Sequence, residues 1–487
     1  MTVTRPPSSG LRRGLSVWPA IAISIALMAP SMAANINPQG TATAVGRATP
    51  LAFFLAALAV LLIAYVFVRL CQYYRHAGSV YVFAGATLGP HAGAIAGLGL
   101  VGTYTFYGLV TSSAAGIFGS SFLDVIGVWN NQPWWSGFLV GAVALALSLF
   151  FAITPAKQAG SVLLSTEGIT VLLIVVVAVI VAIRIAVGNA PGDAHFTADI
   201  FKVPSGTSNS TLFLGIIFGL LSFAGFEAAA TLGEEADNPR RDIPRAILGV
   251  AIFGGIYFTV VTAIEMTAFG TDPKGVAKFI SSPALMGDLG SSYVGNWVGD
   301  IITLGAGVSA FACCLACVVG ASRMVFAVAR DLSPNTPLAR ISRHGTPAVA
   351  ASLVVGVIAA IALVCAVAFA AKPFDTFLWS GTIGTLILLV AYLLATLGCI
   401  KLVFIDRKLA VPQWQVVIPV AAVLVILYTL YRNVWPYPTS GAFQWLPVVA
   451  GGWVAVVTLV VVLVPSVPRR LARGMASLEG DYEGEPV

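Results

Sequence analysis

Charged residues are scarce in this chain of 487 residues. Asp, Glu, Lys and Arg together make up 9% of it, whereas a soluble globular chain has about 25%. Hydrophobic residues make up 58%. This composition argues against a soluble globular protein and predicts a membrane protein, with the lipid bilayer as its solvent.

Residues that build catalytic or metal sites are also few, with four His and six Cys in the chain. Cys313, Cys314 and Cys317 lie too close along one apolar run to surround a metal ion tetrahedrally, so we expect them to pack as small apolar residues. The sequence places no nucleophile and base, and no metal cluster, at one membrane depth. It therefore predicts no metal, no cofactor and no enzymatic activity.

Long apolar runs, in contrast, are abundant. A run of about 20 residues is long enough to cross a bilayer as a helix. Counting such runs predicts an all-α integral membrane protein with 12 transmembrane helices. The predicted helices cover residues 15–35, 48–70, 84–118, 134–154, 160–187, 211–235, 247–270, 297–330, 346–371, 375–402, 413–431 and 441–465.

Lys and Arg indicate the orientation, because they resist translocation. With the N-terminus inside, most of the 26 Lys and Arg fall on the cytoplasmic side, so residues 1–14 and 466–487 are expected to be cytoplasmic. The net charge of +6 then belongs to loops near anionic lipid and indicates no nucleic-acid partner. A cleaved signal peptide is the alternative for the N-terminus, because Arg12 and Arg13 precede an apolar run that ends in small residues.

Two of the predicted helices contain a helix-breaking residue at matching depth. Pro30 lies near the middle of the first helix and Gly225 within the sixth. Interrupted membrane helices expose backbone groups that bind polar solutes: a half-helix N-terminus favours a carboxylate, and unwound carbonyls favour an ammonium. The alternative for either residue alone is a kink or a packing position.

Three stretches resemble the amino acid/polyamine/organocation (APC) superfamily of permeases. The most specific begins with Gly225-Phe226-Glu227 and continues, from Glu234 through Ala246, with the Glu-Glu, Asn-Pro and Ile-Pro-Arg-Ala pattern of that superfamily. The end of the eighth helix matches in its Ser-Arg and Ala-Arg-Asp pairs, which contain Arg323 and Arg330. A weaker match is the small-Gly-X-X-Tyr entry to the third helix, ending at Tyr81.

The resemblance implies a LeuT-type fold, in which two inverted repeats of five helices each begin with a broken helix. The transport core would cover residues 15–402, with repeats at 15–187 and 211–402, and residues 413–465 would form two further helices. The first helix lacks the glycine-rich break that is common in the superfamily. Sodium coupling is disfavoured, because Ala312 and Cys313 stand where sodium-coupled relatives have hydroxyls.

The resemblance, together with the breaks, also assigns site residues. The substrate-binding residues are expected to be Ala29, Pro30, Ser31, Met32, Phe223, Ala224 and Gly225. Phe218 and Phe226 are expected to act as gates over the substrate, although phenylalanine at such positions also commonly faces lipid or core. Glu235, Arg323 and Arg330 are expected to form a gate or a structural contact at the cytoplasmic end.

Three glutamates lie inside apolar runs, where an ionised carboxylate is costly and a functional role is the first hypothesis. Glu227 is predicted to stabilise the site and to carry a coupling proton, and a protonated carboxyl bonded to a neighbouring helix is the alternative. Glu167 stands near the position at which proton-coupled relatives have a lysine, so it is the second coupling candidate, with a structural bond as its alternative. Glu265, near the outer end of the seventh helix, is expected to be solvated.

These expectations converge on a multi-pass protein of the cell membrane that transports an amino acid or related amine by alternating access, with protons as the coupling ion. Exchange of two such solutes is the first alternative. A nutrient sensor that binds a solute without moving it is the second.

Overall fold

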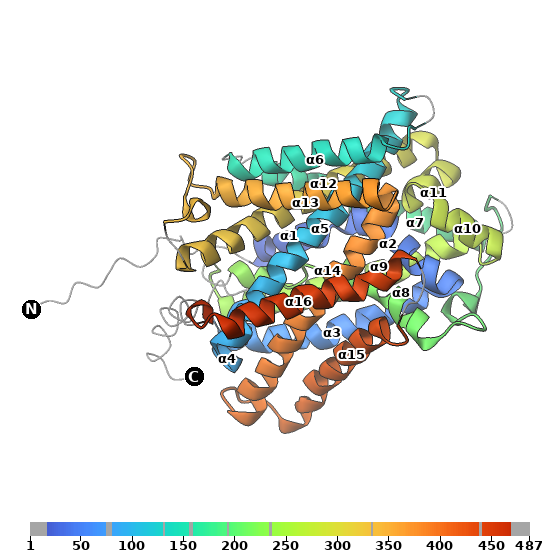
Figure 1. The fold of residues 1–487 in the computed structure, drawn as a ribbon. Coiled ribbons are helices and arrows are strands. Elements are labelled where there is room, and N and C mark those ends of the chain that lie inside the picture. Colours follow the sequence, from blue (N-terminus) through green and yellow to red (C-terminus); the bar gives the residue numbers. More distant parts are fainter. Residues whose placement is uncertain are drawn as a thin grey trace, which may run out of the picture.

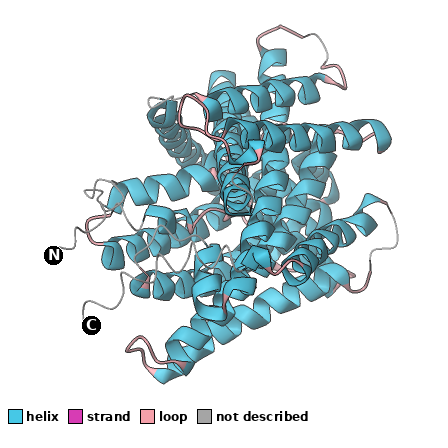
Figure 2. Cartoon of the chain, turned by 60° about the vertical axis from the view of Figure 1, so that its left-hand side comes forward, coloured by secondary structure: helices cyan, strands magenta, loops and turns pink. Residues whose placement is uncertain are grey.

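The fold consists of helices joined by short turns and loops (Figures 1 and 2). The computed structural model describes residues 17–74, 80–129, 132–154, 159–191, 194–232, 236–332, 335–437 and 441–468. These residues contain no strand. The prediction of an all-helical protein is confirmed for this part of the chain.

The helices follow one another along the chain with these bounds. The first are α1 (Val17–Met28), α2 (Pro30–Val45), α3 (Thr49–Tyr73), α4 (Val80–Leu88) and α5 (Pro90–Val125). The next are α6 (Ser136–Ile153), α7 (Ala159–Ala186), α8 (Asn209–Ser222), the short η3 (Ala228–Leu232) and α9 (Pro239–Phe269). The last are α10 (Pro273–Ser281), α11 (Leu285–Tyr293), α12 (Asn296–Leu332), α13 (Ala348–Ala368), α14 (Pro373–Ile400), α15 (Val417–Val434) and α16 (Trp445–Leu463).

Ten helical segments of the described chain are long and apolar enough to cross a membrane. One of them, Val17–Tyr73, contains α1, α2 and α3 in succession. The shorter apolar helix α8 covers Asn209–Ser222. Several crossings of this kind make the chain a multi-pass membrane protein.

Some boundaries differ from the predicted ones. The first helical stretch continues to Val45, beyond the predicted end at residue 35, because the polar residues of α2 are buried within the protein and do not have to reach water. The predicted sixth helix, 211–235, ends as an α-helix already at Ser222. The predicted loop between the seventh and eighth helices contains two short helices, α10 and α11.

The helices are arranged around α5 and α14, which are buried along most of their length (Figure 1). α5 packs mainly against α12 and α14, while α3 packs against α9 and α2 packs against α8. α15 and α16 expose most of their length. Their exposed residues, such as Leu424 and Val456, are apolar, as expected for helices that face lipid.

Candidate functional site

The first interrupted stretch is centred on Ala29, which separates α1 from α2. Ala29 has a left-handed backbone conformation, with φ 47° and ψ 58°, although it is not a glycine. The conformation costs an L-residue roughly 1–2 kcal/mol. The backbone stays bonded on either side, because the Ala29 amide donates to the Ile25 carbonyl and the Ala33 amide donates to the Ala29 carbonyl.

The first amides of α2 donate to side chains from distant parts of the chain. Pro30 has no N–H. The Ser31 amide donates to Glu167 Oε1 on α7 at 2.8 Å, and the Met32 amide donates to Ser309 Oγ on α12 at 3.3 Å. All of these residues are buried. The positive end of α2 is therefore closed by a carboxylate and a hydroxyl of the protein itself.

The carbonyls at the end of α1 lose their usual partners at the same place. In a continuous helix the carbonyls of Ala26, Leu27 and Met28 would accept the amides four residues later. Proline has no amide, and the other two amides bond to α7 and α12. The Leu27 carbonyl accepts the Cys313 thiol at 3.2 Å instead.

The second interruption follows α8. After Ser222 the chain leaves the α-helix, and Gly225 adopts φ 100°, a conformation that favours glycine. A Cβ atom at Gly225 would lie 2.8 Å from Leu27 Cβ, so the two interruptions are in direct contact. Ser24 on α1 also bonds to this segment, because its hydroxyl donates to the Phe226 carbonyl and accepts the Ala229 amide.

A cavity of about 30 Å³ lies beside this contact. This is room for about two water molecules, so the cavity is too small for an amino acid in this conformation. The lining residues come from α1, α2, α5, α8, α12, α14 and the segment after α8. They are Leu27, Met28, Met32, Thr103, Tyr104, Tyr107, Val110, Thr111, Leu221, Ala224, Gly225, Glu227, Cys313, Cys317 and Leu388.

Among the described residues that line the cavity, Glu227 is the one with a charged type of side chain. Its side chain is buried, and its Oε2 has no hydrogen-bond partner among the described residues. The phenol of Tyr392 lies beside the carboxylate. A buried carboxyl group that lines a cavity and has one oxygen without a partner is suited to bind a cation or a proton.

The predicted substrate-binding residues divide into three groups. Met32, Ala224 and Gly225 line the cavity. Ala29, Pro30 and Ser31 do not line it; they form the turn that shapes it. Phe223 lines a second, smaller cavity of about 10 Å³ together with Ala224 and Phe226.

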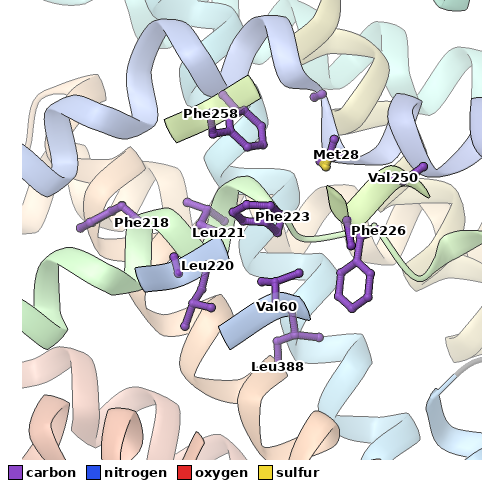
Figure 3. Close-up of a cluster of buried hydrophobic side chains, with 14 of the residues drawn as sticks. Met28, Val60, Phe218, Leu220, Leu221, Phe223, Phe226, Val250, Phe258 and Leu388 are labelled. Atoms are coloured by element: carbon purple, nitrogen blue, oxygen red, sulfur yellow. The ribbon is translucent and has the colours of Figure 1, made fainter. Parts of the chain in front are cut away.

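The two predicted gate residues lie in the hydrophobic core. Phe218 and Phe226 are buried, and neither lines the larger cavity. Figure 3 shows them with Phe223 among other apolar side chains, and the Phe226 ring packs edge-on against Phe67 with the ring centres 5.8 Å apart. A gating role would require these rings to move.

Several lining residues were not predicted as site residues, and five of them lie on α5. Thr103, Tyr107 and Thr111 are four residues apart and therefore lie on one face of that helix. This spacing was a usable signal, because polar side chains on one face of a membrane helix point toward the protein interior. Ser309, one helical turn before Ala312 and Cys313, was missed in the same way.

The expectation for Glu265 is wrong. Its side chain is fully buried, and both carboxylate oxygens lack hydrogen-bond partners among the described residues. The short helices α10 and α11, for which the sequence predicted a loop, pack against α9. They cover the end of that helix, so Glu265 does not reach solvent.

At the other end of the molecule, Arg323 and Arg330 are exposed on the last turns of α12. The Arg330 guanidinium lies 5.7 Å from the centre of the Phe326 ring. Glu235, the third member of the predicted cytoplasmic contact, lies outside the described residues.

Buried, interrupted membrane helices around a small cavity are the architecture of a solute transporter. The comparison with known proteins agrees with this architecture. A family model described as amino acid permease matches residues 20–467. The chain belongs to the amino acid permease family of the APC superfamily.

Three relatives illustrate the family. An uncharacterized transporter of Mycobacterium tuberculosis is 30% identical over 357 residues, which is 72% of this chain and 73% of the relative. The branched-chain amino acid permease BcaP of Bacillus subtilis is 25% identical over 70% of this chain and 72% of its own length. The low-affinity putrescine importer PlaP of Escherichia coli is 26% identical over 66% of this chain and 68% of its own length.

Proposed function

We propose that this permease is a secondary active transporter of an amino acid or a related amine, and that the cavity between the two interruptions is its substrate site. The observation that carries the proposal is the Glu227 carboxylate, which is buried and unpartnered at one oxygen and faces a cavity formed by two broken stretches. The names of the relatives support this range of solutes, since one is called a branched-chain amino acid permease and another a putrescine importer.

The proposed topology has 12 membrane spans in a LeuT-type arrangement. In this assignment α1 and α2 together form the first span, and α8 with η3 forms the sixth. These are corresponding positions in two inverted repeats of five helices, as expected for a transporter whose site lies between the repeats. The protein would lie in the cell membrane with both termini in the cytoplasm.

Transport would proceed by alternating access, with protons as the coupling ion. Glu227 would take up a proton or a substrate ammonium in the cavity. Glu167 would link protonation to helix movement: its carboxylate holds α7 to the amide end of α2, and loss of the charge would weaken that bond. Phe218 and Phe226 would move as gates, and Glu235, Arg323 and Arg330 would close the cytoplasmic end.

Uptake into proteoliposomes tests this proposal. Purified protein would be offered a pool of labelled amino acids and amines, with and without an inward proton gradient, beside Glu227→Gln. The matched control is Asp406→Asn, an exposed carboxylate that lies away from the cavity lining. We expect gradient-stimulated accumulation by the wild type and the control, and its loss in Glu227→Gln.

Two other results would contradict parts of the proposal. Uptake only into liposomes preloaded with solute would identify an exchanger. Saturable binding without flux under either condition would identify a sensor and would contradict the transport function.

A further inference from the structure

Among the described residues, the lining of the cavity contains one carboxylate and no cationic side chain. We propose that its substrate is a small organic amine with one positive charge, an apolar chain and no carboxylate, in preference to the α-amino acid of the same side chain. This inference rests on the proposed function, because it assumes that the cavity is the transport site.

The first step concerns the amides at the start of α2, the place where an interrupted helix would bind a carboxylate. Every one of them is already used. The amides of Ser31 and Met32 donate to Glu167 and Ser309. Those of Ala29 and Ala33 donate to backbone carbonyls. A substrate carboxylate would have to displace Glu167 and would then meet its like charge nearby.

The backbone amides of the segment after α8 are also already in use. Gly225 and Glu227 have amides that lie against the Glu227 carboxylate itself. Six further amides of this segment donate to backbone carbonyls or to a serine hydroxyl; they belong to Phe223, Ala224, Phe226, Ala228, Ala229 and Ala230. Among the described residues, the amides of the second interruption from Phe223 to Ala230 are therefore also already in use.

The helix ends and the carboxyl group at the cavity, in contrast, favour a cation. The ends of α1 and α8 that border it, at Met28 and Leu221, are C-terminal ends, which favour cations. Glu227 supplies a carboxyl group with one oxygen that has no hydrogen-bond partner among the described residues. Tyr104 and Tyr107 add aromatic rings, which also attract ammonium groups. The part of the chain that the structure describes contributes no Lys, Arg or His to the lining.

The remaining lining residues indicate the chemistry of the uncharged part of the ligand. Most are apolar or sulfur-containing, among them Met32, Val110 and Leu388. Such a surface accommodates an alkyl or aryl chain. The lining has one carboxylate, so a second ammonium on a diamine would be left without a charged partner. A monoamine with an apolar chain fits this arrangement best.

The test compares two ligands that differ by one group: 3-methylbutylamine and leucine, of which the amine is the decarboxylated form. Equilibrium binding to the purified full-length protein is measured by calorimetry, so passive diffusion of the amine does not affect the readout. We expect the wild type to bind the amine at least tenfold more tightly than leucine. We expect Glu227→Gln to lose at least tenfold in affinity for the amine, while Asp406→Asn binds as the wild type does.

A second variant tests the reason for the selectivity. Glu167→Ala frees the Ser31 amide and removes the like charge, so we expect the ratio of leucine to amine affinity to rise at least tenfold. If instead the wild type binds leucine as tightly as the amine, and Glu227→Gln weakens leucine binding, the proposed substrate class is wrong. The cavity would then still be the substrate site. If neither ligand nor any solute of the labelled pool binds or is transported, the proposed function itself fails.

Discussion

Glu167 and Ser31 are separated by 136 positions in the chain, and the carboxylate of the first accepts the backbone amide of the second at 2.8 Å. This bond connects α7 to the start of α2, directly after the left-handed residue Ala29. It fixes where the first membrane stretch is interrupted and removes a donor from the site. One side chain thus connects the shape of the first interruption with the ligand preference that we propose for the cavity.

Removing this bond should destabilise the protein. In Glu167→Ala a buried amide loses its partner, which costs about 1–3 kcal/mol. We expect a lower midpoint of thermal unfolding for the detergent-purified variant than for the wild type. Glu167→Gln keeps an acceptor oxygen, so its unfolding midpoint should fall less than that of Glu167→Ala. Equal midpoints for the alanine variant and the wild type would show that the Ser31 amide gains little from Glu167.

Gly225 is predicted to tolerate no side chain. A Cβ atom there would lie 2.8 Å from Leu27 Cβ, and its φ of 100° is unfavourable for any L-residue. Gly225→Ala should therefore abolish uptake or folding, as measured by proteoliposome transport and size-exclusion chromatography. The matched control is Gly356→Ala on α13, whose added Cβ would meet nothing within 4 Å. A transport-competent Gly225→Ala protein would contradict the described contact between the two interruptions.

Replacing Glu265 should stabilise the protein, in contrast to replacing Glu167. The Glu265 carboxylate is buried without partners among the described residues, so its burial costs stability. We expect Glu265→Leu, which has a similar shape and no polar group, to raise the unfolding midpoint and to keep proton-driven uptake. A folded Glu265→Leu protein that has lost stimulation by the proton gradient would place Glu265 in the coupling pathway instead.

The cavity cysteines should report ligand binding. Cys313 and Cys317 line the cavity, whereas Cys399 is buried on α14 away from it. In a variant that retains only Cys317, we expect a membrane-permeant maleimide to react slowly, and 3-methylbutylamine to slow the reaction further. A variant that retains only Cys399 serves as the control and should be insensitive to the ligand. Labelling of Cys317 at a rate independent of any transported solute would contradict its place in the site.

The sequence could predict the features that depend on local composition. Apolar runs located most of the membrane helices, Pro30 marked the first interruption to within one residue of Ala29, and Gly225 marked the second. Glu227 was identified from its apolar surroundings and from family resemblance, and it does line the cavity.

Features that depend on distant parts of the chain could not be predicted. Nothing local to Ser309 indicates that its hydroxyl accepts the Met32 amide. The burial of Glu265 depends on α10 and α11, which are short helices that hydropathy does not distinguish from loop. The polar face of α5 at Thr103, Tyr107 and Thr111 was visible, but the same pattern also serves helix packing.

The central claim is that the substrate binds between the two interruptions with its charge on Glu227. The most direct measurement is an electron cryomicroscopy structure of the full-length protein with the best solute from the uptake assay. We predict ligand density in the cavity, with the ligand nitrogen within hydrogen-bond distance of Glu227 and with Glu167 still bonded to the Ser31 amide. Ligand density outside the cavity, or a ligand carboxylate in the place of Glu167, would contradict the account.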